Sequence, residues 1–343
     1  MNKNNNMGYI GLENLGNTCF MNSCLQILKE ITQISNIINE NINNNKLLDN
    51  IDSILTVEWN NLNNMMINNN GVIRPSRFLD TLQKYSKKKK YDLFTGYSQN
   101  DIQEFFLLLI NALHNSISIK KTITINGVAK NDIDLLAIEC YKVLSNYYKN
   151  EYSDINKLFQ GIQVNIIQGL QYKGNSIRPE IFADICLPIF YDKQIAKNIY
   201  DCFDIYVKHE FLNGDNKWYN EKEKKKEDAV KYIRFWSFPD ILFIMFKRFS
   251  YNGRSKLNNI IDFPIDNLNL SKYVCGYKPE SYVYELFGVC NHSGSTQGGH
   301  YTSFVKNKHD KWLHFNDTIF NEINIDKIVT AKAYCLFYRK KNN

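Results

Sequence analysis

The sequence predicts an α+β fold, with a helical amino-terminal half followed by a mostly antiparallel β half. In the first half apolar residues recur three and four positions apart, which is the period of an amphipathic helix. After Leu158-Phe159-Gln160-Gly161 the pattern changes to short runs of β-branched and aromatic residues, which indicate strands. The chain has 343 residues, of which 44% are hydrophobic, so it is long enough to bury a large core.

The first predicted helix follows a loop with turn-forming residues at 11–17. Thr18 is its candidate N-cap, and apolar residues follow helical spacing from Phe20 to Ile31. Cys19 therefore lies at a helix N-terminus, where the macrodipole favours a thiolate, and we expect its pKa to lie below the usual value of about 8.5. The alternative interpretation of Cys19 is a small buried core residue.

Further helices are predicted at 51–66, 75–85 and 131–148 and after Gly96. The helix after Gly96 has the clearest apolar face, and Ser98 and Asp101 form a capping-box-like pair at its start. Gln99, Asp101 and Glu104 point away from that face. Ordinary solvated residues at a helix start are the alternative interpretation of these three.

The predicted strands are 163–170, 182–188, 241–249, 282–291, 299–305, 312–316 and 333–338. A hairpin centred between Lys308 and His309 places His300 opposite Asn316 or Asp317. An amide or carboxylate in that position orients the imidazole and leaves its other nitrogen for a thiol. The glycines at 298 and 299 allow a thin extended peptide to pass close to His300.

Composition excludes several classes of protein. No apolar run approaches the roughly 20 residues of a membrane span, and the first residues lack a secretory signal. The eight cysteines include no Cys-x-x-Cys motif, which indicates free thiols in an intracellular protein of the cytoplasm or nucleus. The net charge of +7 is scattered, and solvated loops explain the lysine runs at 87–90 and 222–226, so we expect neither nucleic-acid nor membrane binding.

Two segments resemble the boxes that carry the catalytic residues of ubiquitin-specific proteases, which are deubiquitinating cysteine peptidases with a papain-like fold. Residues 11–28 resemble the cysteine box, and residues 298–317 resemble the histidine box. In the same order, 96–105 resembles the Gln-x-Asp-x-x-Glu-Phe helix of the family, 158–161 its Phe-x-Gly motif and 246–249 its Leu-Lys-Arg-Phe strand.

The resemblance implies a right-hand architecture with a helical thumb, an antiparallel β palm and β fingers. It places a disordered leader at 1–7 and a single catalytic domain at 8–343, with the thumb at about 8–155, the fingers at about 156–240 and the palm at about 241–340. The implied reaction is thiol-dependent hydrolysis of the peptide or isopeptide bond after the C-terminal glycine of ubiquitin. The implied partners are ubiquitin and ubiquitinated proteins, and we expect a monomer.

Site roles are carried over residue by residue. By this resemblance Cys19 is the nucleophile, His300 the general base, Asn316 the residue that orients it, Asp317 the adjacent acidic position and Asn14 the oxyanion donor. The positions that match the channel for the ubiquitin tail are Gln99, Asp101, Glu104, His292, Gly298, Gly299 and Tyr301.

The chain departs from the family pattern at two places. Many relatives bind zinc in the fingers through two Cys-x-x-Cys pairs, whereas the first expected site here has no cysteine and the second offers only Asn220 and Glu223. We therefore expect metal-free fingers and no cofactor. Asn316 stands where an aspartate is common, so it accepts the imidazole N–H without adding a charge.

Three alternatives remain open at this point. One is a ubiquitin-binding module that has lost its chemistry. Another is a papain-like endoprotease of broad specificity, which shares the order Cys, His, Asn. The third is the same chemistry on a ubiquitin-like modifier.

Overall fold

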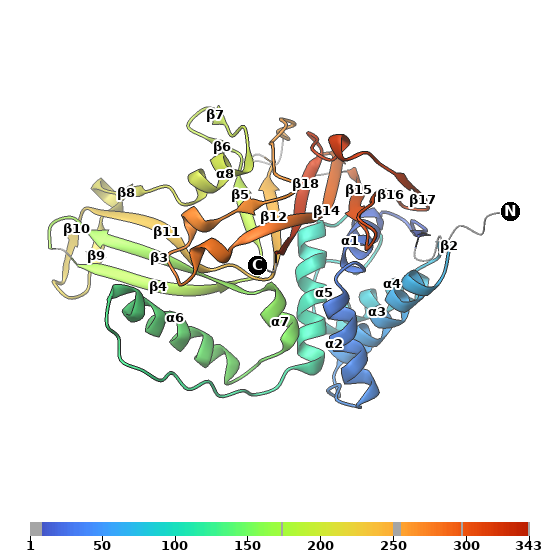
Figure 1. Cartoon of the computed structure of the whole chain (residues 1–343), viewed down its shortest axis with the longest axis horizontal. Coiled ribbons are helices and arrows are strands. Elements are labelled where there is room, and N and C mark those ends of the chain that lie inside the picture. The colour runs from blue at the N-terminus through green and yellow to red at the C-terminus, as the bar shows by residue number, and fades with distance from the viewer. Residues whose placement is uncertain (1–8, 173, 250–254, 296–297, 342–343) are drawn as a thin grey trace.

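The computed structural model describes residues 9–172, 174–249, 255–295 and 298–341, so the leader expected at 1–7 lies outside the described residues. Figure 1 shows a group of helices beside a mostly β region, which confirms the predicted α+β class. The helices are α1 (Cys19–Leu28), α2 (Thr32–Asn43), α3 (Ile51–Asn68), α4 (Ser76–Lys89), α5 (Ile102–Ile117), α6 (Asp132–Tyr148), α7 (Asp154–Phe159) and α8 (Ile199–Tyr206).

The helices predicted at 51–66, 75–85 and 131–148 are confirmed as α3, α4 and α6. Two expected caps are wrong in detail. The Thr18 side chain makes no capping hydrogen bond to α1. At α5 the expected pairing of Ser98 with Asp101 is replaced by a single N-cap, because Asp101 Oδ1 accepts a hydrogen bond from the Gln103 backbone N–H at 2.7 Å.

The large sheet forms the β region next to the helices. Its strand order is β17-β16-β15-β14-β18-β12-β5, with β13 paired to β14. The strands are β5 (Ile185–Pro188), β12 (Ile241–Lys247), β13 (Leu268–Asn269), β14 (Val283–Gly294), β15 (Gly299–Lys306), β16 (Trp312–Asn316), β17 (Ile319–Glu322) and β18 (Ala333–Lys340). Pairing is antiparallel except between β12 and β5.

A second sheet, in the order β4-β3-β11-β8, extends away from α1–α5, and α6 lies alongside it (Figure 1). Its strands are β3 (Gly161–Gly169), β4 (Asn175–Phe182), β8 (Glu210–Leu212) and β11 (Ala229–Ser237). The strand expected at 182–188 is thus divided, because β4 ends at Phe182 and β5 joins the large sheet. Three two-stranded pairs complete the β structure: β1 (Ile10–Leu12) with β2 (Gly71–Ile73), β6 (Phe190–Tyr191) with β7 (Gln194–Ile195), and β9 (Trp218–Asn220) with β10 (Lys225–Glu227).

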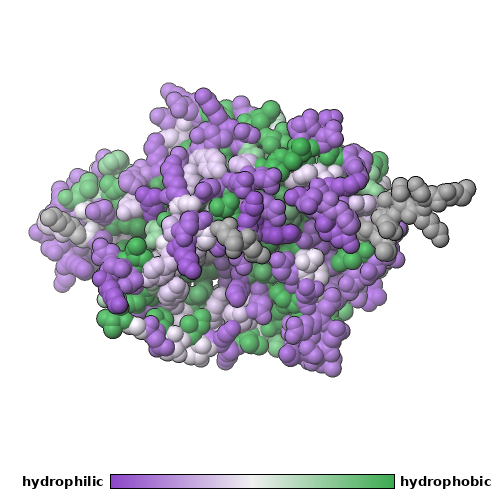
Figure 2. Space-filling model, in the orientation of Figure 1, coloured by the Kyte–Doolittle hydropathy of each residue, from purple (hydrophilic) through white to green (hydrophobic). Residues whose placement is uncertain are grey.

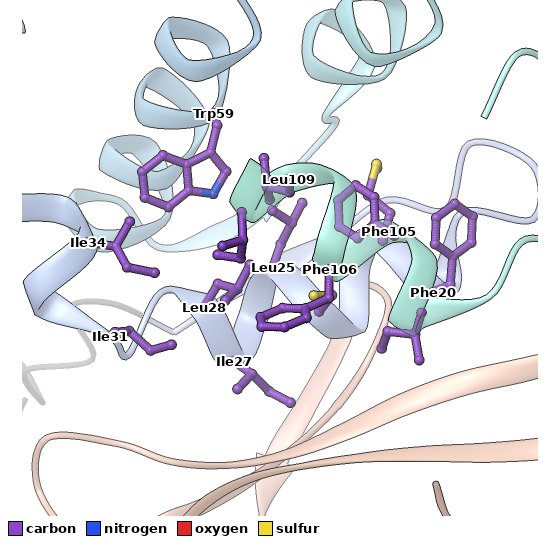
Figure 3. Close-up of a cluster of buried hydrophobic side chains, with 14 of the residues drawn as sticks. Phe20, Leu25, Ile27, Leu28, Ile31, Ile34, Trp59, Phe105, Phe106 and Leu109 are labelled. Atoms are coloured by element: carbon purple, nitrogen blue, oxygen red, sulfur yellow. The ribbon is translucent and has the colours of Figure 1, made fainter. Parts of the chain in front are cut away.

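One hydrophobic core joins the helices to the large sheet. Figure 3 shows Phe20 of α1 near Phe105 of α5, together with Phe106 and Trp59. The Phe106 ring stacks on Phe243 of β12 with centroids 4.4 Å apart and meets Phe337 of β18 edge-on at 5.5 Å. The first helix is buried along its whole length between α5 and β15, so its N-terminus is held against the sheet.

Figure 2 shows that hydrophilic residues cover most of one face, with smaller hydrophobic groups between them. Within the described ranges, no helix combines the length and the apolar character that crossing a membrane requires.

Candidate functional site

Cys19 is the first residue of α1, and its side chain is only 2% exposed. The loop before it is shaped by the side chain of Asn14, whose Oδ1 accepts hydrogen bonds from the backbone N–H groups of Gly16 and Thr18, both at 3.1 Å. Thr18 Oγ1 accepts from the Leu15 backbone N–H at 2.9 Å. These bonds explain why Thr18 does not cap the helix, because its hydroxyl oxygen faces the loop.

Burial raises the pKa of the Cys19 thiol above its usual range. A hydrogen bond from the Tyr301 backbone N–H lowers the pKa, and the nearby Asp317 carboxylate raises it further. The lowered pKa expected from the helix N-terminus is therefore wrong for the unliganded chain, because loss of solvent around the sulfur outweighs the backbone donors. In this state the sulfur carries its proton at neutral pH.

His300 lies on β15, directly before the residue whose N–H faces the Cys19 sulfur. Its Nε2 lies 2.7 Å from Asn316 Oδ1, and because that oxygen only accepts, Nε2–H is the donor. The other ring nitrogen, Nδ1, is then unprotonated and able to take a proton. Among the described residues no hydrogen bond joins the Cys19 thiol directly to the His300 ring.

The β15–β16 hairpin differs from the expected register by one residue. Ser303 pairs with Phe315, so the hairpin is centred at His309 and not between Lys308 and His309. The ladder stops at this pair, and beyond it the side chains of His300 and Asn316 still meet.

Asp317 does not contact His300 through a hydrogen bond in the described structure. Its Oδ2 accepts from Asn14 Nδ2 at 3.0 Å, and its Oδ1 accepts from Asn22 Nδ2 at 2.8 Å. The Asp317 backbone carbonyl accepts from the Leu12 N–H at 2.9 Å. Asp317 thus fixes the loop before Cys19 against α1, while Asn14 remains exposed at the surface of the site.

Gln99 bridges the helical region and β15. Its Nε2 donates to the Gly299 backbone carbonyl at 2.7 Å, and its Oε1 accepts from the Gly299 N–H at 3.0 Å. The same Nε2 lies 3.3 Å from Asn17 Oδ1. A side-chain amide therefore occupies the backbone hydrogen-bonding groups of Gly299, one residue before His300.

Three of the other predicted channel residues, Glu104, Gly298 and Asp101, are exposed or half-buried. Glu104 and Gly298 are exposed. Partial loss of solvent around the Glu104 carboxylate and the nearby Asp101 carboxylate raise the pKa of Glu104. Asp101 caps α5 and accepts hydrogen bonds from the hydroxyls of Tyr334 at 2.8 Å and Tyr301 at 3.4 Å. Its oxygens therefore hold α5 to β15 and β18.

His292 lies on β14, where it pairs with Tyr301 of the neighbouring β15, and it is 3% exposed. Its ring lies against Tyr301, with centroids 4.6 Å apart, and Lys256 Nζ lies 3.0 Å from its Nδ1. Burial, Lys256 and His300 lower the pKa of His292 to about 4, so the ring is neutral at neutral pH. A side chain at Gly299 would collide with this ring, since an added Cβ would lie 2.3 Å from His292 Nε2.

The residues at the expected zinc positions do not fit that metal. Asn220 is buried, and its amide donates to Glu227 Oε1 at 2.7 Å, whereas Glu223 is exposed. An amide and one carboxylate cannot replace four thiolates. The described part of the chain contains no cluster of three His, Cys, Asp or Glu side chains able to hold a metal ion.

The sequence analysis missed two residues that the structure places at the site. Asn22 lies one helical turn after Cys19, and this i, i+3 spacing is a signal that could have identified it. Tyr334 reaches Asp101 from β18, and no local pattern marks that contact.

A family model described as "Ubiquitin carboxyl-terminal hydrolase" matches residues 10–338. The chain is similar to ubiquitin carboxyl-terminal hydrolase 2 of Homo sapiens, with 31% identity over 346 residues, which cover 98% of this chain and 56% of that protein. It is also similar to a probable ubiquitin carboxyl-terminal hydrolase of Acanthamoeba polyphaga mimivirus, with 27% identity over 427 residues, which cover 97% of this chain and 90% of that protein.

The fold is similar to that of a chain in the solved SAGA DUB module of Ubp8, Sgf11, Sus1 and Sgf73 bound to monoubiquitin. The TM-score is 0.75 at 26% sequence identity, and the match covers 98% of this chain and 70% of the solved one. The chain spans about half the length of the human relative, at 56%.

Proposed function

The chain belongs to the ubiquitin carboxyl-terminal hydrolase family, and from that premise we propose that it is a deubiquitinase. It hydrolyses the peptide or isopeptide bond after the C-terminal glycine of ubiquitin. The observation that carries the proposal is the placement of Cys19 at the start of a buried helix beside β15, where Asn316 orients His300. The solved neighbour bound to monoubiquitin supports ubiquitin as the partner.

The reaction follows from the donors and acceptors of the site. His300 Nδ1 takes the proton of the Cys19 thiol as the sulfur attacks the carbonyl carbon of the terminal glycine. Asn14 Nδ2 has a second hydrogen besides the one directed at Asp317, and this hydrogen stabilises the oxyanion. His300 then protonates the leaving amine, and water activated by His300 hydrolyses the thioester and releases ubiquitin.

The tail of ubiquitin reaches Cys19 between α5 and β15. Gln99, Asp101, Glu104, His292, Gly298, Gly299 and Tyr301 are the residues proposed to line or support that path. The exposed Glu104 offers a negative charge to basic groups of the tail, and the exposed Gly298 adds no side chain beside the tail backbone. His292 and Tyr301 act from behind, since both are buried.

The regional assignment is part of the same proposal. The thumb comprises about 8–155, the fingers about 156–240 and the palm about 241–340, with β5 of the middle segment added to the palm sheet. All eight cysteines are free thiols, which suits the reducing cytosol or nucleus.

The test incubates wild type and Cys19→Ala with a panel of di-ubiquitins and with ubiquitin carrying a fluorogenic group on its C-terminus. We expect wild type to release both products and the variant to bind ubiquitin without turnover. Unfolded casein and a ubiquitin-like modifier with a Gly-Gly tail complete the panel. Cleavage of casein alone would establish an endoprotease, and binding of ubiquitin without turnover by wild type would establish a binding module.

A further inference from the structure

A fully buried carboxylate lies at the end of the second sheet that is far from Cys19, where β9 and β10 meet the turn after β3 (Figure 1). Glu227 is the last residue of β10, and its side chain is 0% exposed. The mechanism proposed above makes no use of this charge. A buried charge is unfavourable unless hydrogen-bond donors surround it.

Three donors surround Glu227. Its Oε2 accepts from the backbone N–H groups of Gln171 at 2.9 Å and Tyr172 at 3.0 Å, and its Oε1 accepts from Asn220 Nδ2 at 2.7 Å. Asn220 is 2% exposed, and its Oδ1 accepts from the backbone N–H groups of Lys222 at 3.1 Å and Glu223 at 3.3 Å. We call Glu227 and Asn220 the clamp, because together they connect the turn after β3 to the turn between β9 and β10.

The backbone is fitted closely around the clamp. An added Cβ at Gly169 would lie 2.5 Å from Glu227 Oε1, and one at Gly174 would lie 2.3 Å from Asn220 Nδ2. A Cβ at either glycine would therefore displace Glu227 or Asn220 from its present position. The clamp is therefore a built feature of the two turns.

The segments joined by the clamp carry exposed apolar side chains. Leu170 is 55% exposed, Tyr172 is 44% exposed and Tyr219 is 51% exposed. Tyr172 donates its own backbone N–H to Glu227, Leu170 precedes the donor Gln171, and Tyr219 precedes Asn220. Apolar groups held in place on a fixed backbone bind a partner at a smaller entropic cost than the same groups on loose turns.

We propose that Glu227 and Asn220 are positioning residues that hold together the turn after β3 and the turn between β9 and β10, at the outer end of the fingers. They do so without a metal ion, and they keep this end in the shape that receives the globular body of the substrate. This inference rests on the proposed function, because the substrate body is that of ubiquitin. The clamp joins two turns by hydrogen bonds at the place where thiolate ligands for zinc are missing.

The pH dependence of the clamp follows from its donors. The hydrogen bond from the Tyr172 N–H lowers the pKa of Glu227, and the Asn220 and Gln171 donors act in the same direction. A carboxylate with a lowered pKa in the folded state stabilises that state above its ordinary pKa, and this contribution is lost as the pH falls through the lowered value. The hydrogen bonds to the Glu227 carboxylate therefore persist at neutral and mildly acidic pH.

The test compares Glu227→Gln with Glu223→Gln, a matched control that removes an exposed carboxylate four residues away. Two substrates are used: ubiquitin with a C-terminal fluorophore, and a short fluorogenic peptide ending in Gly-Gly that lacks the folded body. We expect Glu227→Gln to raise KM for the ubiquitin substrate about 5- to 10-fold, the equivalent of losing one buried hydrogen bond, with kcat unchanged. Cleavage of the peptide by this variant, and both activities of the control, should match wild type.

Hydrogen exchange supplies a second readout that does not depend on activity. The Gln171 and Tyr172 amides should lose protection in Glu227→Gln, and in Asn220→Ala they should change in the same direction by a smaller amount. Protection of both amides equal to that of wild type would overturn the clamp, and so would an equal loss of activity on the two substrates. A metal chelator should leave the KM of wild type for the ubiquitin substrate unchanged. A rise in this KM with chelation would overturn the proposal that the clamp needs no metal ion. If wild type cleaves neither substrate, the proposed function fails while the exchange measurement still tests the clamp.

Discussion

At the residue scale, neighbouring side chains determine which hydrogen-bonding atoms of His300 and Asn14 can contact the substrate or the thiol. Asn316 accepts the Nε2–H of His300, and in the proposed mechanism Nδ1 takes the proton of the thiol. Asp317 accepts one hydrogen of Asn14, and the other is the proposed oxyanion donor. The helix pattern indicates Cys19 and the hairpin pattern indicates His300 with Asn316 or Asp317 as its partner, whereas the choice of Asn316 depends on the resemblance to the family. The sequence could not predict that Asp317 contacts Asn14 and Asn22, because these contacts depend on how the loop before α1 packs against the end of β16.

The pairing of Asp317 with Asn14 predicts coupled effects on turnover. Asn14→Ala should lower kcat about 10²- to 10³-fold, the usual effect of losing one oxyanion donor, with little change in KM. Asp317→Ala should lower kcat in the same direction because it releases the Asn14 side chain. The double variant should be no slower than Asn14→Ala alone. Additive losses in this double-mutant cycle would contradict the coupling.

The raised pKa of Cys19 predicts the pH dependence of alkylation in the absence of substrate. The thiolate is the reactive form, so the rate of reaction with iodoacetamide should still be rising with pH above the usual cysteine range. Asp317→Asn removes a charge that raises this pKa, so the variant should react faster than wild type at a given pH below the plateau. Mass spectrometry of Cys19 peptides follows the rate. A plateau in wild type already reached near neutral pH would show a stable thiolate and contradict the structure.

At the element scale, prediction succeeded where apolar periodicity was strong. The face of α5 and the strands β14, β15 and β18 follow such patterns, and all of them lie around the main core. The predicted helices lack α2 and α8, although Asn198 and Asp201 form a capping box at α8 that is visible in the sequence. The predicted strands also lack β4 and β11, in which most residues are half-buried or exposed, so no clear alternation marks either strand.

The N-cap of α5 predicts a measurable loss of stability. Asp101→Ala removes the acceptor for the Gln103 N–H and should lower the free energy of unfolding by about 1–2 kcal/mol in urea denaturation. Asp101→Asn keeps a capping oxygen and should retain most of that stability. Equal losses in the two variants would assign the effect to the carboxylate Oδ2, which accepts from Tyr301 and Tyr334, and not to the cap.

At the scale of the whole molecule, α1–α5, α7 and the large sheet share one core, and the site lies where α1 and α5 meet the sheet. Phe106 of α5 contacts Phe243 and Phe337, which lie 137 and 231 positions later in the sequence. The sequence indicates that each of these residues is apolar. Only the fold shows that they pack together, because such contacts have no local pattern.

This shared core predicts cooperative loss of structure and activity. Phe106→Ala should lower the free energy of unfolding by about 3–5 kcal/mol, as expected for removing a buried aromatic ring. Leu135→Ala, at an exposed position of α6, should change it by no more than about 0.5 kcal/mol. Circular dichroism and residual activity should report the same urea midpoint. Separate midpoints would indicate that helices and sheet unfold independently.

The central claim is that Cys19 attacks the end of ubiquitin, and covalent capture tests it most directly. Wild type is incubated with ubiquitin whose C-terminus carries a thiol-reactive electrophile, and the product is digested and mapped by mass spectrometry. We expect one adduct, on Cys19, that is absent from Cys19→Ala and forms more slowly in His300→Ala. The absence of an adduct, or an adduct on any of the other seven cysteines, would contradict the claim.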